Sequence, residues 1–179
     1  MEVRIKGKEK LLKQLGKVPK AIEDAIFDAT FEIVEDMQGR VESELNSSIF
    51  YNRGGLAGSW MNEVVKEGES VVGRVWSNSA TAFYREFGTG SVGAKSPKDA
   101  PPDINLTYTM EPWFIPAEMV DVDLNAIYGM PKITINGKDF YRTNGQPARP
   151  YLYPAYKETM KDAPDVYKEH VSKHLKGGL

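Results

Sequence analysis

The chain has 179 residues, of which 41% are hydrophobic and 11% aromatic, and no apolar run approaches the roughly 18 residues of a membrane span, so we expect a globular protein without a membrane partner. With 23 Lys and Arg against 25 Asp and Glu, its formal net charge of -2 makes nucleic acid at most an incidental partner. Cysteine is absent, which excludes a thiolate nucleophile and a cysteine metal site. The length is that of one domain, which we expect over residues 1–179 and without a cofactor.

Two helices are predicted near the amino terminus. A short one over 8–15 follows a possible strand over 2–6 and closes at Gly16. The second is long, because apolar residues recur three or four positions apart from the turn after Pro19 onwards. They are Ile22, Ile26, Ala29, Ile33, Met37, Val41 and Leu45. Phe27, Phe31 and Val34 widen this apolar face, which predicts burial against a sheet and leaves open a second contact with a neighbouring subunit.

Three strands are predicted after a loop over 46–58. The first two cover 60–66 and 71–76 and are joined by a turn at 67–70. The third covers 83–87 and ends in a turn at Gly88 and Gly90, two residues that permit positive φ. An antiparallel meander between two helices is the simplest arrangement, so the expected fold class is α+β.

Glu86 is notable because it stands between aromatic residues where that third strand would end. A carboxylate that folding removes from water needs a cation or several backbone donors. We predict that Arg149 supplies the cation, since a guanidinium holds a carboxylate through two parallel hydrogen bonds. The residues that follow resemble a phosphate-binding loop, but Ala94 separates Gly93 from Lys95, so nucleotide binding is not expected.

Residues 91–131 are rich in proline and glycine, with one short possible strand over 104–109. An irregular insertion of this length in a compact domain is expected to be functional or mobile. Its side chains Trp113, Phe114, Ile115 and Met119 are unfavourable to leave in water. We therefore expect a partner-binding arm that is mobile in the free subunit. Asn136-Gly137 then predicts a hairpin between 132–135 and 138–141.

A last helix is predicted after a proline-rich connector over 145–156. Its expected apolar face consists of Tyr156, Met160, Ala163, Tyr167 and Val171. Pro164 is expected to break or kink it near Asp162, before it ends at Gly177-Gly178. His170 and His174 share a face, as metal ligands can, but no third ligand is evident, so surface histidines are preferred and no metal site is predicted.

Three short segments stand out along the whole chain: 55–59, 84–89 and 149–155. The residues of interest in the last two are Tyr84, Glu86, Phe87, Gly88, Thr89, Arg149, Pro150 and Pro154. Together with the two bracketing helices, the segments resemble the head-to-tail joining, or tail-completion, family of long-tailed bacteriophages. The resemblance lies in two runs that the family shows: tyrosine-x-glutamate-phenylalanine-glycine-threonine, and arginine-proline-aromatic-x-x-proline-alanine. The chain departs from the family's glycine-arginine-leucine-x-x-serine segment, because Gly55 directly precedes Leu56.

The resemblance implies a non-enzymatic structural protein of the virion neck or tail end, made in the cytoplasm of a bacterial host. It implies a homo-oligomeric ring, of six subunits in the virion, whose partners are tail-tube and head-connector proteins. Two alternatives stay open. One is a carboxylate-dependent hydrolase that uses Glu86 with Asp121 or Asp123. The other is a small host-directed binding protein whose arm grips a cellular target.

Overall fold

The computed structural model describes residues 13, 15–48 and 55–178. They belong to two compact units, Met1–Asn78 with Pro154–Leu179, and Ser79–Tyr153. Long helices and antiparallel sheets confirm the predicted α+β class. The strand predicted over 2–6 and most of the helix predicted over 8–15 lie outside the described residues. Among the described helices, none combines the length and the apolar character that crossing a bilayer requires.

Helix α2 (Val18–Ser48) is the longest element of the first unit and confirms the predicted long helix. Most of the predicted stripe is buried or half-buried, and Ala25 and Val34 extend the buried face. The fully or nearly fully buried residues of the helix are Ala25, Ala29, Thr30, Ile33, Val34, Val41 and Leu45. Phe27 and Phe31 remain 40% and 45% exposed, so α2 keeps an apolar strip on its outer side.

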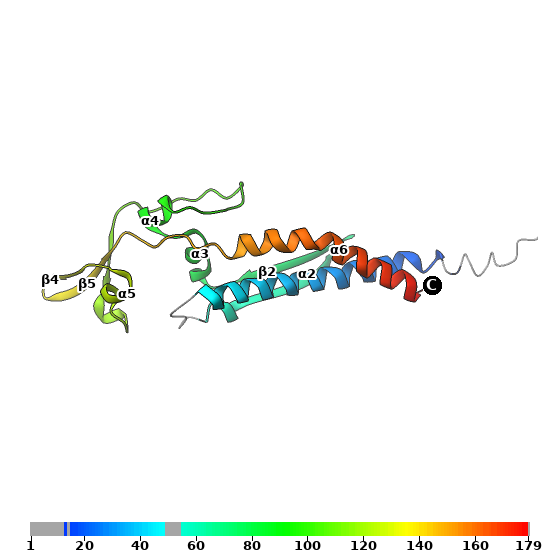
Figure 1. Ribbon diagram of the computed structural model, residues 1–179, viewed down its shortest axis with the longest axis horizontal. Coiled ribbons are helices and arrows are strands. Elements are labelled where there is room, and N and C mark those ends of the chain that lie inside the picture. Colours follow the sequence, from blue (N-terminus) through cyan, green and yellow to red (C-terminus); the bar gives the residue numbers. More distant parts are fainter. Residues whose placement is uncertain (1–12, 14, 49–54, 179) are drawn as a thin grey trace, which may run out of the picture. The chain divides into compact units, whose positions relative to one another are not determined.

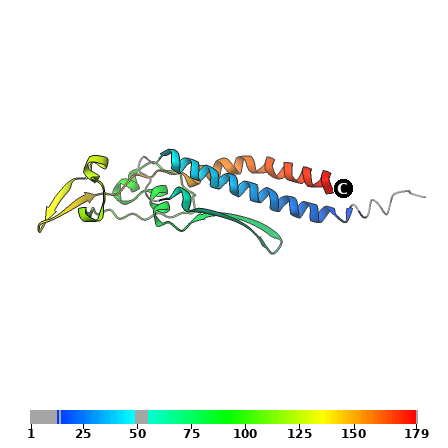
Figure 2. The ribbon, with the colours of Figure 1, turned by 90° about the horizontal axis from the view of Figure 1, so that it is seen from below.

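Strands β1 (Trp60–Glu67) and β2 (Ser70–Ser77) form the predicted antiparallel hairpin, after the short 3-10 helix η1 (Ala57–Ser59). The hairpin lies along α2 in both views (Figures 1 and 2). Gly73 permits this packing, because a Cβ there would lie 2.5 Å from Val34 Cγ1 and 2.9 Å from Thr30 Cγ2. A larger residue at this position would push the hairpin away from the helix.

Helix α6 (Leu152–Gly178) runs antiparallel to α2, which lies beside it in Figures 1 and 2. Of the predicted break or kink at Pro164, the break does not occur, because the helix continues through this residue. Pro164 and Met160 are both exposed, so water can reach the Met160 carbonyl that lacks its helical donor. The predicted face is also displaced. Small side chains at Ala155, Thr159 and Ala163 are buried, whereas Tyr156 and Met160 are 42% and 39% exposed.

The second unit contains a three-stranded antiparallel sheet with strand order β3-β5-β4 and several short helices. The strands are β3 (Trp113–Pro116), β4 (Lys132–Ile135) and β5 (Lys138–Thr143). The short helices of this unit are α3 (Ala80–Phe87), α4 (Gly90–Lys95), η2 (Ala117–Met119) and α5 (Leu124–Tyr128). The strand predicted over 83–87 is therefore wrong. Phe83 and Phe87 lie one helical turn apart and contact each other with tilted rings, whose centroids are 4.8 Å apart.

The Asn136-Gly137 hairpin is confirmed, with φ of 50° and 78° at the two turn residues. Residues 91–131 are less irregular than predicted, because they supply β3, η2, α5 and most of α4. Strand β3 pairs with β5 from Trp113↔Thr143 to Pro116↔Phe140, which anchors this part of the chain in the sheet. The strand predicted over 104–109 does not form, and residues 96–112 contain neither helix nor strand.

Candidate functional site

The carboxylate of Glu86 accepts three backbone hydrogen bonds from the residues that begin α6. Tyr151 N and Leu152 N donate to Oε2 over 2.7 and 2.9 Å, and Tyr153 N donates to Oε1 over 3.0 Å. Only 3% of Glu86 is exposed. The first amides of a helix have no intrahelical acceptor and carry partial positive charge. Glu86 therefore satisfies these amides with a buried negative charge, 65 to 67 residues away in sequence.

The predicted Glu86–Arg149 ion pair does not form. Arg149 is exposed, and among the described residues it makes no ion pair with Glu86, whose oxygens already accept the three amide bonds. Arg149 meets α3 through its backbone instead, where its N–H donates to Arg85 O over 2.9 Å. Of the two ways to satisfy a buried carboxylate, backbone donors prevail here, since they need no second charge to be taken out of water.

The glycine turn after α3 fits closely against the segment before α6. Thr89 N donates to Gln146 O over 2.9 Å, and Gln146 N donates to Thr89 Oγ1 over 3.1 Å. At Gly88, where φ is 75°, a Cβ would lie 2.6 Å from Ala148 N and 2.7 Å from Gln146 O. Only glycine fits such a position. We call residues 84–90 and 144–153 the motif junction, since these two parts of the chain form one hydrogen-bonded structure.

Two aromatic side chains of the motif junction are buried beside Glu86. Tyr151 is 1% exposed and its hydroxyl donates to Ala82 O over 3.1 Å, while Phe87 is 7% exposed. Burial, and next the negative charge of Glu86, raise the pKa of Tyr151 well above its usual range. The tyrosine therefore remains neutral and acts as a hydrogen-bond donor, and it offers no base for catalysis.

The irregular segment 96–112 is tied to α4 near its start and to the motif junction near its end. Lys98 Nζ donates to the carbonyls of Gly93, Ala94 and Ser96 over 2.7, 3.3 and 3.0 Å, and lies 5.2 Å from the ring centroid of Tyr108. The Tyr108 hydroxyl donates to Phe87 O over 2.9 Å. These contacts satisfy the carbonyls that end α4 and restrict the segment where it leaves the helix.

The candidate partner-binding residues divide into two pairs. Trp113 and Ile115 are half-buried in β3, and the Trp113 ring lies so close to Gly90 that a Cβ there would be 2.9 Å from its Cζ3. Phe114 is 44% exposed and Met119 is 75% exposed. A hollow of about 490 Å³ is lined by residues that lie between Phe114 and Met119 in sequence and by residues of the β4–β5 turn and β5, namely Pro116, Ala117, Glu118, Gly137, Lys138, Asp139 and Phe140. Phe114 and Met119 are therefore the two that a partner can reach.

The carboxylates of the hydrolase alternative have separate structural partners. Asp123 caps α5, accepting from Asn125 N over 2.9 Å and Ala126 N over 3.3 Å, and it also accepts from the Tyr141 hydroxyl. Hydrogen bonds from Ala126 N–H and then Asn125 N–H lower the pKa of Asp123. Glu86 has its own three amide donors. Among the described residues, no hydrogen bond joins Glu86 to Asp121 or Asp123.

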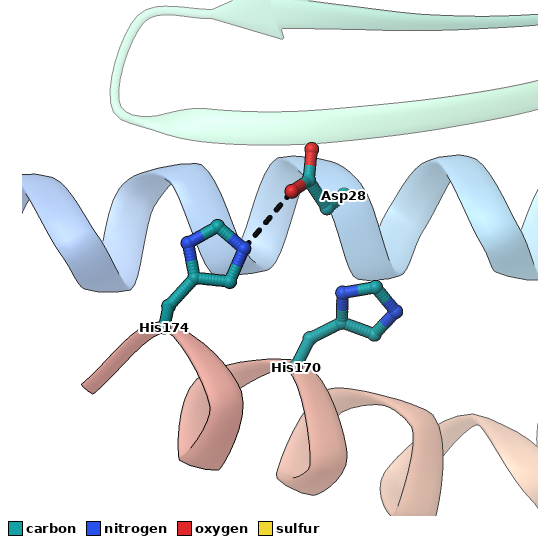
Figure 3. A group of neighbouring side chains, drawn as sticks. All are labelled: Asp28, His170 and His174. Atoms are coloured by element: carbon teal, nitrogen blue, oxygen red, sulfur yellow. Dashed lines mark hydrogen bonds and ion pairs between the residues drawn. The ribbon is translucent and has the colours of Figure 1, made fainter. Parts of the chain in front are cut away.

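The histidine pair that stands out in the sequence lies in the first unit, between α2 and α6, where it meets two carboxylates that the sequence did not assign to it. His170 Nε2 lies 2.8 Å from Glu32 Oε2. His174 Nε2 lies 2.9 Å from Asp28 Oδ2, a contact drawn as a dashed line in Figure 3. Asp28, His170 and His174 each offer one ligand atom, and these three atoms lie within 4.8 Å of one another. The missed signal was a matching spacing, since Asp28 and Glu32 are four residues apart on α2, as the histidines are on α6.

Comparison of the chain with protein-family models, with curated proteins and with solved structures gives no match. The likeness to phage joining proteins therefore rests on the sequence motifs alone.

Proposed function

We propose that this protein is a non-enzymatic structural protein of a bacteriophage virion neck or tail end, where copies of the chain form a ring that joins or completes tail and head. The observation that carries the proposal is the motif junction. Two segments, 84–89 and 149–155, resemble the joining family by sequence, and the first supplies the Glu86 carboxylate while the second supplies its amide donors. Such mutual dependence is expected of a family-specific structural element.

Two apolar surfaces support an assembly role. On α2, Phe27 and Phe31 lie one turn apart and are 40% and 45% exposed, which suits contact with a neighbouring copy of the chain. In the second unit, Phe114 and Met119 are exposed, and residues between them in sequence line the hollow at the β4–β5 turn. Exposed aromatic and methionine side chains are enriched in protein interfaces. We assign the first surface to ring closure and the second to the tail-tube or head-connector partner.

The test is deletion of the gene from the phage that encodes the chain, followed by electron microscopy of the lysate. The proposal predicts complete heads and complete tails that are not joined, and recovery of whole particles when the wild-type chain is supplied from a plasmid. Infectious, joined particles without the protein would contradict it. A monomeric purified protein would not, because a ring of this kind can close on docking alone.

Complementation by variants tests the two surfaces. Phe27→Ser with Phe31→Ser, and separately Phe114→Ser with Met119→Ser, are expected to fail to restore joined particles. Ile104→Ser is the matched control, because Ile104 is 41% exposed in segment 96–112 and belongs to neither surface. Each variant's circular dichroism and melting temperature must match those of the wild type. Full complementation by either double variant would remove that surface from the proposal.

A further inference from the structure

The histidine cluster between α2 and α6 has a geometry that ion pairing alone does not explain. The Nδ1 atom of His170 is buried and has no hydrogen-bond partner among the described residues. The same ring uses its other nitrogen, Nε2, for Glu32 over 2.8 Å. Figure 3 shows that the free nitrogen of His170 faces the side of the cluster on which His174 and Asp28 lie. A buried ring nitrogen without a partner is unfavourable, and a bound cation would provide its missing partner.

We propose that Asp28, His170 and His174 bind one divalent first-row cation of the zinc type. Two imidazole nitrogens and one carboxylate oxygen form a common set of three protein ligands for Zn²⁺, with the fourth position left to water or another group. The ligand atoms of a tetrahedral zinc site, each about 2.0–2.2 Å from the metal, are about 3.4 Å apart. The three atoms here lie within 4.8 Å of one another, so each pair has to approach by at most about 1.4 Å when the metal binds.

Glu32 has a distinct part in this site as a positioning residue. By accepting a hydrogen bond from His170 Nε2–H, it fixes the proton on that nitrogen and leaves Nδ1 with the lone pair that a metal needs. Carboxylates that orient metal-binding histidines in this way are frequent in zinc sites. The half-exposed surroundings also fit, since the side chains of His170 and His174 are 15% and 25% exposed and Asp28 is 54% exposed. The cation has a path from solvent.

The expected consequence is a metal-dependent link between the two long helices. Asp28 lies on α2 and the histidines lie near the carboxyl end of α6, in the same compact unit. Binding to the folded chain alone raises its stability in proportion to the logarithm of free metal concentration. The inference does not depend on the proposed neck function, because all three proposed ligands belong to this chain.

The test uses the full chain without a histidine tag and adds ZnCl₂ as the only probe. His170 and His174 are the two histidines of the chain, so ring signals in a long-range nitrogen-proton spectrum come from this site alone. The proposal predicts saturable binding of one Zn²⁺ per chain by calorimetry. It also predicts metal-bound nitrogen shifts at His170 Nδ1 and His174 Nε2, and a rise in melting temperature that EDTA reverses. Mg²⁺ at the same concentration is expected to do none of this, since it prefers oxygen ligands.

Variants separate this site from adventitious binding. His174→Ala and Asp28→Asn are expected to weaken Zn²⁺ binding at least about tenfold, and Glu32→Ala about 10–100-fold. Asp24→Asn is the matched control, one turn before Asp28 on α2 and likewise exposed, and is expected to bind as the wild type does. Melting temperatures in EDTA identify any variant that fails to fold. If a variant does not fold, the histidine nitrogen shifts of the wild-type chain on zinc addition test the inference in its place. Unchanged histidine shifts on zinc addition, or equal loss in Asp24→Asn, would overturn the inference.

Discussion

Replacing Glu86 by alanine should destabilise the second unit more than any exposed substitution. The change removes three hydrogen bonds to a carboxylate that is 3% exposed. Hydrogen bonds to charged groups contribute about 1.5–3 kcal/mol each, but water can replace part of them, because Leu152 and Tyr153 are only half-buried. We therefore expect a loss of about 3–5 kcal/mol in the free energy of unfolding, near or below the lower end of the simple sum of three such bonds.

Glutamine at the same position gives an intermediate result. Its amide oxygen can still accept from Tyr151 and Leu152, but its NH₂ group would face the Tyr153 N–H, so one bond and the charge are lost. We expect Glu86→Gln to cost about 1–3 kcal/mol. The assay is urea unfolding followed by the fluorescence of Trp113, a residue of the same unit, in a background where Trp60 and Trp76 are phenylalanine.

Arg149 supplies the control. Because its side chain is exposed and does not meet Glu86, Arg149→Ala should change stability by less than about 0.5 kcal/mol, and a double-mutant cycle should give coupling below about 0.5 kcal/mol. A loss below about 1 kcal/mol for Glu86→Ala would refute the helix-capping role. Strong coupling to Arg149 would restore the ion pair expected from sequence.

Three further changes test other parts of the fold by the same unfolding assay or by NMR. Gly88→Ala should lower the free energy of unfolding by more than about 3 kcal/mol, because backbone strain and a clash with neighbouring backbone atoms combine. Gly137→Ala, which has open space around it, should lower it by about 1–2 kcal/mol. Similar losses in the two variants would contradict the close fit at Gly88. Thr30→Val should cost about 1–3 kcal/mol by leaving the Tyr167 hydroxyl, 2.9 Å away, without its partner, and a neutral result would remove that link between the long helices. The Asp123 cap of α5 should persist above about pH 4 and be lost as pH falls through the lowered pKa of this carboxyl. The NMR signals of the two capped amides, Asn125 and Ala126, report the loss. Unchanged signals down to about pH 2 would contradict the capping role.

Elements with a strong local signal were predictable. The three- and four-residue spacing of α2 extends over the whole helix, and the Asn136-Gly137 turn fixes its hairpin through two positive φ angles. The β1–β2 hairpin was likewise found with nearly correct ends. Each of these depends on neighbours within a few residues, which a sequence pattern can carry.

Elements decided by distant contacts were not predictable. Helix α3 is one of these, because eight residues with two phenylalanines and a tyrosine have the composition of a strand, while the buried Glu86 and Phe87 set its helical face. The donors to Glu86 come from more than sixty residues later, and Asp28 meets His174 across 146 residues. The displaced face of α6 follows from packing on α2, which favours the small side chains of Ala155, Thr159 and Ala163.

The most direct measurement of the central proposal is the position of the protein in intact particles. A short epitope tag after Leu179, in a phage that stays infectious, allows gold-labelled antibody to mark the chain in electron micrographs. The proposal predicts label at the junction of head and tail, with a copy number in purified virions that matches a single ring of six. Label along the tail shaft, on the capsid surface, or absent from purified virions would contradict it.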